Sequence, residues 1–425
     1  MNFENVIGYE TIKEELLQVC DMIRNKEVYE KMGAKMPGGI LLYGDPGLGK
    51  TLMAKCFIRE SGLNAYTVRR SKGTDEFVKE IGQVFTTAKK NAPSVVFLDD
   101  MDKFANEDNA HRDAEEYVAV QSGIDEVNGT GVFIIATAND IYKLPDSLMR
   151  AGRFDKKIEV RCPTENDACK IIRHYLKNKS ISEDVNLEDI SKMISYSSCA
   201  ELETILNEAA VSAAFARHST ISMEDITKAV MRMQYDAPDN YTKPSKEDLE
   251  KVALHEAGHL VVCEVLCPGS VGVASIRSSG RDSKGGFIRR CIEFDRKTYE
   301  IPVSLAGKAA VELYYSEDCA DGCESDIRRA YADIRDAICH NGITGMGYID
   351  IKSYKFPDTS ENLNSRTEAV VHAELERYLL KARDILLKNR NFLETVAEQL
   401  LEKETLLFSD IKRIRESVSI VDVAV

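Results

Sequence analysis

GDPGLGKT at residues 44–51 is the stretch that decides the fold of this chain. It fits the pattern G-x-x-x-x-G-K-[ST], follows the apolar run at 40–43 and precedes a helical pattern at 52–60. In this order of strand, loop and helix, glycines let backbone N–H groups curl around phosphates at a helix N-terminus. The alternative is a plain glycine-rich turn, but the flanking strand and helix patterns favour a phosphate-binding loop.

The polar residues of this loop have separate predicted tasks. Lys50 supplies positive charge to the outer phosphates of a nucleotide, and the Thr51 hydroxyl holds Mg²⁺. The residues expected to bind the nucleotide here are Asp45, Pro46, Gly47, Leu48, Gly49, Lys50, Thr51 and Leu52.

A second apolar run at 95–98 ends in two carboxylates, Asp99 and Asp100. Asp99 is expected to hold the magnesium through water, and Asp100 to orient the attacking water. The alternative is a strand that ends in two surface acids without a function, and the presence of a phosphate loop makes the metal-and-water site the favoured interpretation.

The apolar runs at 40–43, 95–98 and 132–135 alternate with helical patterns, which predicts an α/β module with a parallel sheet over residues 1–163. Helix-start signals at Thr164, Asn186 and Ser222 predict a small helical bundle over 164–235. Two prolines indicate a linker at 236–245. Residues 246–425 are predicted to be mainly α-helical, with an insertion of β character between about 270 and 295.

HEAGH at residues 255–259 lies in a helical pattern over 247–266. His255 and His259 are one turn apart on one helix face, so both imidazoles can reach one Zn²⁺. Glu256 lies beside the ion, where it can take a proton from water and later pass it to a leaving amine. Two ordinary helix histidines are the alternative, which the full HExxH spacing makes hard to sustain.

Asn139 ends the strand pattern that begins at 132, and Arg150 and Arg153 follow in SLMRAGRFD at 147–155. Taken alone, two such arginines indicate a solvated face. Together with the phosphate loop and the acidic strand, however, these residues resemble the AAA+ ATPases.

The AAA+ resemblance implies that the chain binds ATP or ADP with Mg²⁺. It also implies that Asn139 senses the γ-phosphate and that Ile7 and Gly8 lie where adenine packs. Arg150 and Arg153 then act as fingers on the nucleotide of a neighbouring subunit, which implies a homo-oligomeric ring, usually a hexamer. Residues 164–235 match the lid of that family.

From His255 onward the chain resembles the peptidase domain of the FtsH family of ATP-dependent zinc proteases. In that family the third zinc ligand is an aspartate in a G-x-x-x-D-[IL] turn, and Asp326 in the stretch 322–327 fits this pattern. The extended metzincin pattern fails because Val262 and Val265 occupy its Gly and His positions. A thiolate ligand is the alternative, with three candidates: Cys263, Cys319 and Cys323.

The chain departs from the FtsH pattern in three places. No membrane span precedes the ATPase module, and Asp100 stands where the family has a longer glutamate, so slow hydrolysis is expected. The pore stretch at 69–75 lacks an aromatic residue, and Phe77 follows too late to replace it. A further stretch at 285–293 is read as a strand, either an edge strand that binds extended substrate or an ordinary interior strand.

The net charge of −14, from 56 basic and 70 acidic residues, argues against nucleic acid and anionic membranes as partners. Two arginine pairs, Arg69-Arg70 and Arg289-Arg290, are interpreted as solvated charge. No run approaches the ~20 apolar residues of a membrane span. Eleven cysteines without CxxC spacing indicate a reducing compartment. We expect a cytoplasmic protein, membrane-associated only if an N-terminal anchor has been removed.

The leading hypothesis is an ATP-dependent zinc endopeptidase that unfolds, translocates and degrades protein substrates as a ring. One alternative is an AAA+ remodelling or assembly ring that binds ATP and scarcely hydrolyses it. The other is an ATP-independent zinc peptidase on a structural ring.

Overall fold

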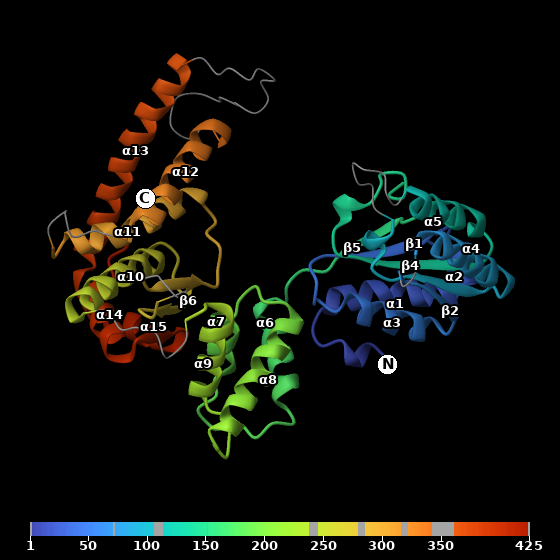
Figure 1. Ribbon diagram of the computed structural model, residues 1–425, viewed down its shortest axis with the longest axis horizontal. Helices are drawn as coiled ribbons and strands as arrows, with labels where there is room; N and C mark the ends of the chain where they lie inside the picture. Colours follow the sequence, from blue (N-terminus) through green and yellow to red (C-terminus); the bar gives the residue numbers. More distant parts are fainter. Residues whose placement is uncertain are drawn as a thin grey trace. The chain divides into compact units, whose positions relative to one another are not determined.

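The computed structural model describes residues 2–70, 73–105, 114–150, 152–237, 245–278, 285–315, 322–341 and 361–423. The chain divides into two compact units, one of Met1–Lys179 with Tyr196–Asn207 and one of Ser180–Ser195 with Glu208–Val425 (Figure 1). Each unit has its own hydrophobic core. No helix within the described ranges combines the length and the apolar composition that crossing a membrane requires.

The first unit contains a five-stranded sheet in the order β2-β3-β4-β1-β5, and all of its strand pairs are parallel. This confirms the predicted α/β module. Strand β3 is buried at every position because helices cover both faces of a parallel sheet. The strands are β1 (Gly39–Tyr43), β2 (Asn64–Val68), β3 (Ser94–Leu98), β4 (Val132–Ala138) and β5 (Lys156–Glu159).

Helices α1 (Glu10–Arg24) and α3 (Lys50–Ser61) cover one face of this sheet, and α4 (Thr74–Lys90) and α5 (Ala114–Val127) cover the other (Figure 1). The neighbours β1, β3 and β4 run parallel, so their carboxyl ends meet at one edge of the sheet. The phosphate loop, the acidic pair and Asn139 follow these three strands. The fold therefore brings the predicted nucleotide residues to one edge.

All four helices predicted after residue 164 are present: α6 (Glu165–Leu176), α7 (Leu187–Met193), α8 (Cys199–Phe215) and α9 (Met223–Gln234). The predicted start signals Thr164, Asn186 and Ser222 are N-caps whose side chains accept backbone N–H bonds. Both compact units take residues from this stretch. The predicted domain boundaries themselves stay a prediction, and residues 238–244 of the predicted linker lie outside the described ranges.

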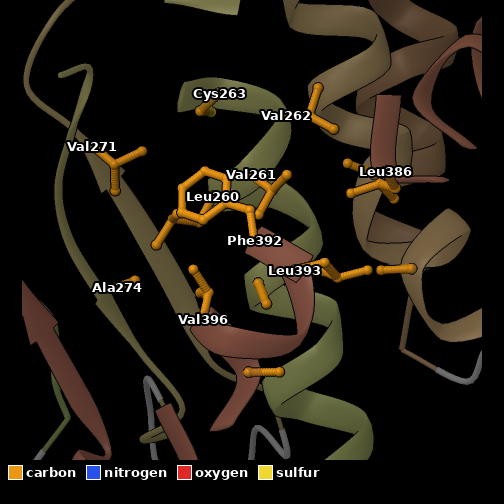
Figure 2. Packing of buried hydrophobic residues seen from close by; sticks show 14 of the residues in the cluster. Leu260, Val261, Val262, Cys263, Val271, Ala274, Leu386, Phe392, Leu393 and Val396 are labelled. Carbon is orange, nitrogen blue, oxygen red and sulfur yellow. The ribbon is translucent and has the colours of Figure 1, made fainter. Parts of the chain in front are cut away.

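Helix α10 (Lys246–Leu266) runs through the core of the second unit. Its Leu260 and Val261 pack against Phe392 of α14 (Arg390–Lys403) and Val271 of β6 (Val271–Ser275), as Figure 2 shows. Because nearly all of its last three turns is buried, α10 is a rigid platform for any side chain it carries. The remaining helices are α11 (Glu300–Glu312), α12 (Glu324–Asn341), α13 (Glu361–Lys388) and α15 (Phe408–Ser417).

A small antiparallel sheet stands beside α10 in the order β7-β6-β8. Its strands are β6 (Val271–Ser275), β7 (Phe287–Arg290) and β8 (Thr405–Leu407). The predicted β insertion is therefore confirmed. Among the described residues β7 pairs with β6 alone, so it is an edge strand, as one of the two interpretations of 285–293 expected.

The prediction that both arginine pairs are solvated charge was wrong for one member of each pair. Arg70 is 31% exposed, and its Nη1 lies 3.0 Å from a carboxylate oxygen of the buried Glu116. Arg290 is 26% exposed, bonds Glu300 at 2.7 Å and lies over the Phe294 ring. Long arginine stems bury readily once a carboxylate meets the guanidinium, and a linear pattern does not reveal that partner.

Candidate metal centre and nucleotide site

The candidate metal centre begins with two helices, α10 and α11, that approach each other closely. A Cβ added at Gly258 of α10 would lie 2.5 Å from the Ala306 carbonyl oxygen of α11. A Cβ added at Gly307 of α11 would lie 2.4 Å from the imidazole of His255. Glycine at both places is what allows the His255 ring to rest on the backbone of α11. The sequence analysis predicted neither contact, although Gly258 stands within the HEAGH stretch.

Three ligand atoms converge at this place. The Nε2 atoms of His255 and His259 lie 3.0 Å apart, and Oδ2 of Asp326 lies 3.1 Å and 3.3 Å from them. Ligand atoms about 2.0–2.1 Å from a tetrahedral zinc ion are about 3.3 Å from one another. The spacing therefore fits zinc with its fourth position open.

Asp326 reaches the histidines from the first turn of α12. Gly322 precedes that turn with φ of 99°, a left-handed conformation that glycine adopts without strain. This explains why the G-x-x-x-D pattern needs its glycine. The turn brings Asp326 to a histidine that stands 71 residues earlier in the chain.

The second nitrogen of each histidine also has a neighbour. Nδ1–H of His259 donates to the Val303 carbonyl oxygen at 2.7 Å, which leaves Nε2 free for a metal. Nδ1 of His255 lies 3.8 Å from Sγ of Cys323. Of the thiolate candidates, Cys263 lies in the hydrophobic core and Cys323 is on the side of His255 away from Nε2. The third candidate, Cys319, lies outside the described residues.

Glu256 is 4% exposed, and burial raises its pKa to about 7. A carboxyl group near neutrality can both accept and return a proton, as general acid–base chemistry requires. Burial also lowers the pKa of His255. Burial works against ionisation of Asp326, yet its hydrogen bonds to both imidazoles hold its pKa below the usual range. Two of the three ligands thus favour the deprotonated form that binds metal.

Gly286, just before the edge strand β7, closes the other side of Glu256. A Cβ at this position would lie 2.7 Å from Cγ of Glu256 and 2.3 Å from the Ser275 carbonyl oxygen. The backbone leading into β7 thus approaches the Glu256 carboxylate more closely than any residue with a side chain allows. Strand β7, which pairs with β6 alone among the described strands, begins one residue beyond Gly286.

The phosphate loop in the first unit has the conformation that its glycines predict. Gly44, Gly47 and Gly49 have φ of 140°, 79° and 89°. Nζ of Lys50 donates to the carbonyl oxygens of Gly44 and Asp45 at 2.7 Å each. The Thr51 hydroxyl, at the start of α3, donates to Oδ1 of Asp99 at 2.9 Å. Hydroxyl and carboxylate therefore meet where Mg²⁺ would be held.

Two further predicted nucleotide residues, Asp100 and Asn139, have partners in the same unit. Asp100 has φ of 56°, and Nζ of Lys103 donates to its Oδ2 at 2.7 Å. The backbone N–H of Asn139 donates to Oδ1 of Asp102 at 3.0 Å. Asp102 was not predicted, although it follows the acidic pair by two residues. Its buried carboxylate fixes the end of β4, which carries Asn139.

The two predicted finger arginines differ. Arg153 makes a paired contact with Asp125, with Nε–Oδ1 at 2.9 Å and Nη2–Oδ2 at 2.8 Å, while Arg150 is exposed. Arg153 is therefore held by its own chain, and Arg150 points its charge to solvent.

At the predicted adenine position, Gly8 has φ of 73°, and a Cβ there would lie 2.8 Å from the Asp167 carboxyl group. Ile7 precedes Gly8 and is half-buried. The Tyr9 hydroxyl donates to the Arg161 carbonyl oxygen at 3.0 Å. The predicted adenine segment is therefore tied to the residues that connect β5 with α6.

The predicted pore stretch is described only in part, since residues 71–72 lie outside the described ranges. Nε of Arg69 lies 3.8 Å from Oδ2 of Asp99. Phe77 is completely buried and packs edge-on against Phe104. A ring in the core cannot contact a substrate, so Phe77 is no substitute for a pore aromatic.

Two family models match the chain. The ATPase family associated with various cellular activities (AAA) matches residues 40–162, and peptidase family M41 matches residues 242–414. The chain therefore combines a module of the AAA ATPase family with a module of peptidase family M41.

Relatives over nearly the whole chain identify the family. The chain is 32% identical to the ATP-dependent zinc metalloprotease FtsH of Leptotrichia buccalis and 32% identical to that of Streptobacillus moniliformis. It is 30% identical to FtsH 2 of Symbiobacterium thermophilum. These matches take in 97%, 100% and 97% of this chain and 57%, 65% and 74% of the relatives. The chain belongs to the FtsH family, and it spans less than two thirds of the first two relatives.

Proposed function

We propose that this chain is an ATP-dependent zinc endopeptidase that unfolds, translocates and degrades polypeptides as a homo-oligomeric ring, in keeping with its family. The single observation that carries the proposal is the convergence of His255, His259 and Asp326 at zinc-ligand spacing, with Glu256 buried beside them. The proposed organisation is an ATPase module at 1–163, a lid at 164–235 and a peptidase domain at 246–425.

At the peptidase site, His255, His259 and Asp326 would hold the zinc. When bound, zinc supplies Lewis acidity for a peptide carbonyl and for water. Glu256 takes a proton from the attacking water on its carboxylate and returns it to the leaving amine. Strand β7 binds the substrate backbone as an added antiparallel strand, since its outer backbone groups face no partner strand among the described residues.

At the ATPase site, Lys50 would neutralise phosphate charge and Thr51 and Asp99 would hold Mg²⁺, while Asp100 would orient water and Asn139 would sense the γ-phosphate. Arg150 is the better candidate for a finger supplied to a neighbouring subunit because it is exposed, whereas Arg153 is bound to Asp125. A finger in trans makes hydrolysis depend on assembly, and a hexamer is the proposed assembly.

The test compares the degradation of an unstructured protein by the wild type and by Glu256→Gln. The amide keeps the size of the side chain but cannot accept the proton. We expect cleavage to fall by about 10²–10⁴-fold, while zinc content by metal analysis stays at the wild-type level. Unaltered cleavage by Glu256→Gln would exclude this mechanism.

The second candidate is an ATP-binding remodelling ring that scarcely hydrolyses, and one contact favours it. Oδ2 of the short Asp100 side chain is paired with Lys103 at 2.7 Å, so one oxygen of the carboxylate that should orient water already has a partner. Steady-state ATPase measurements separate the two candidates. Turnover stimulated by unfolded polypeptide supports the protease, and tight ATP binding without turnover supports the remodelling ring. Chelator-sensitive cleavage without nucleotide supports an ATP-independent peptidase.

A further inference from the structure

We propose that Cys323 is a positioning residue for the zinc ligand His255. Its sulfur accepts a hydrogen bond from Nδ1–H of the imidazole and so keeps Nε2 turned toward the metal. This inference rests on the proposed zinc site and assigns to the thiol a role that is distinct from direct metal binding.

The geometry places the His255 ring between three fixed groups. Sγ of Cys323 lies 3.8 Å from Nδ1, and Oδ2 of Asp326 lies 3.1 Å from Nε2. The face of the ring rests on Gly307, where a Cβ would lie 2.4 Å away. One short turn therefore reaches both nitrogens of the same imidazole, with a sulfur at one and a carboxylate at the other.

The thiol is itself held in place. Cys323 is 3% exposed, and its carbonyl oxygen accepts the N–H of Ile327 in the first turn of α12. Asp326 belongs to the same turn. Any movement of Cys323 therefore moves the carboxylate as well, and the two contacts with His255 act as one clamp.

The chemistry requires a partner on this side of the ring. A metal at Nε2 takes the lone pair of that nitrogen, so the proton of the neutral imidazole stands on Nδ1 and needs an acceptor. For His259 that acceptor is the Val303 carbonyl oxygen at 2.7 Å. For His255 it is a sulfur, which accepts hydrogen bonds weakly. His255 is thus the less firmly oriented of the two histidine ligands.

The test uses the full chain with Cys323→Ala, Cys323→Ser and the control Cys263→Ala. Cys263 is a buried thiol of α10 that packs in the hydrophobic core one turn beyond His259. Zinc affinity is measured by chelator competition, and thermal unfolding is followed on the metal-free proteins. Loss of the acceptor in Cys323→Ala should weaken zinc binding about threefold to tenfold, below the 10–100-fold typical of stronger outer partners.

Cys323→Ser keeps an acceptor and should bind zinc more tightly than Cys323→Ala, while Cys263→Ala should match the wild type. Equal affinity of Cys323→Ala and wild type would overturn the inference, as would an equal loss in Cys263→Ala. A thiolate-to-metal charge-transfer band in the cobalt(II)-loaded wild type, absent from Cys323→Ser, would also overturn it, because Cys323 would then be a ligand. A wild type that binds no zinc would instead overturn the proposed function.

Discussion

The candidate nucleotide site and the candidate metal centre of this chain are built in opposite ways. The phosphate loop is eight consecutive residues whose glycines adopt positive φ angles and whose lysine bonds the carbonyl groups of the same loop. The metal centre joins His255 to Asp326, which are 71 residues apart in the chain. Helix α11, which packs against the His255 ring at Gly307, contributes no candidate ligand among the described residues. Local backbone conformation forms the first site, and packing between helices forms the second.

Glycine shows this difference most clearly. Gly49 has φ of 89°, and a Cβ there would meet no atom within 4 Å. Gly307 lies inside α11, where any residue could adopt the backbone conformation, yet a Cβ there would strike the His255 ring. The same residue type therefore relieves backbone strain in one site and makes room for a ligand in the other.

Among the variants that separate the two sites, Asp326→Ala should have the largest effect, which is a loss of zinc affinity. A structural zinc ion held by four protein ligands binds with about 10–16 kcal/mol, so one ligand is worth roughly 3 kcal/mol, or about 10²-fold in affinity. Chelator competition measures this loss. ATP affinity is the control and should not change, because the nucleotide residues lie in the other compact unit. Retained zinc affinity would show that Asp326 is not a ligand.

Gly307→Ala should have the next largest effect. The added methyl group must displace an imidazole that is held at both nitrogens, so zinc affinity should fall about tenfold. Gly82→Ala is the matched control, since Gly82 also lies in a helix but has open space at its Cβ position. That control should raise the free energy of unfolding by about 1 kcal/mol and leave zinc binding unchanged.

Gly49→Ala is the counterpart of Gly307→Ala in the candidate nucleotide site. Its left-handed backbone costs about 1–2 kcal/mol for an alanine, so ATP affinity should fall about tenfold while zinc affinity stays constant. Isothermal titration with ATP and chelator competition give the two values. A loss of zinc affinity in Gly49→Ala, or of ATP affinity in Gly307→Ala, would contradict the separation of the two sites.

Asp100→Glu should have the smallest effect. The longer side chain extends the carboxylate by one methylene group beyond its contact with Lys103, so steady-state ATP turnover should rise about threefold at unchanged ATP affinity. Lys103→Ala is the companion variant, because it frees the shorter carboxylate without extending it. If both variants turn over no faster than the wild type, reach and pairing of this carboxylate do not limit hydrolysis.

Sequence reasoning succeeded where chemistry follows local spacing. The caps at Thr164, Asn186 and Ser222, the parallel sheet and the helix that carries His255 and His259 are all present as predicted. It failed for Arg70 and Arg290, whose carboxylate partners lie on other elements. It could not reveal why positions 307 and 286 require glycine, because the sequence does not show which atoms of other segments lie close to them.

By itself the sequence determined which residues could form the two candidate sites, since a phosphate loop and a pair of histidines one helical turn apart depend on backbone geometry within a few residues. Only the tertiary structure decided how the metal centre is completed. Asp326, Cys323 and Gly307 meet His255 because α11 and α12 pack beside α10, and close packing between distant segments depends on the shapes of many side chains together. Spacing along the chain contains the information on local backbone geometry and lacks the information on packing between distant segments.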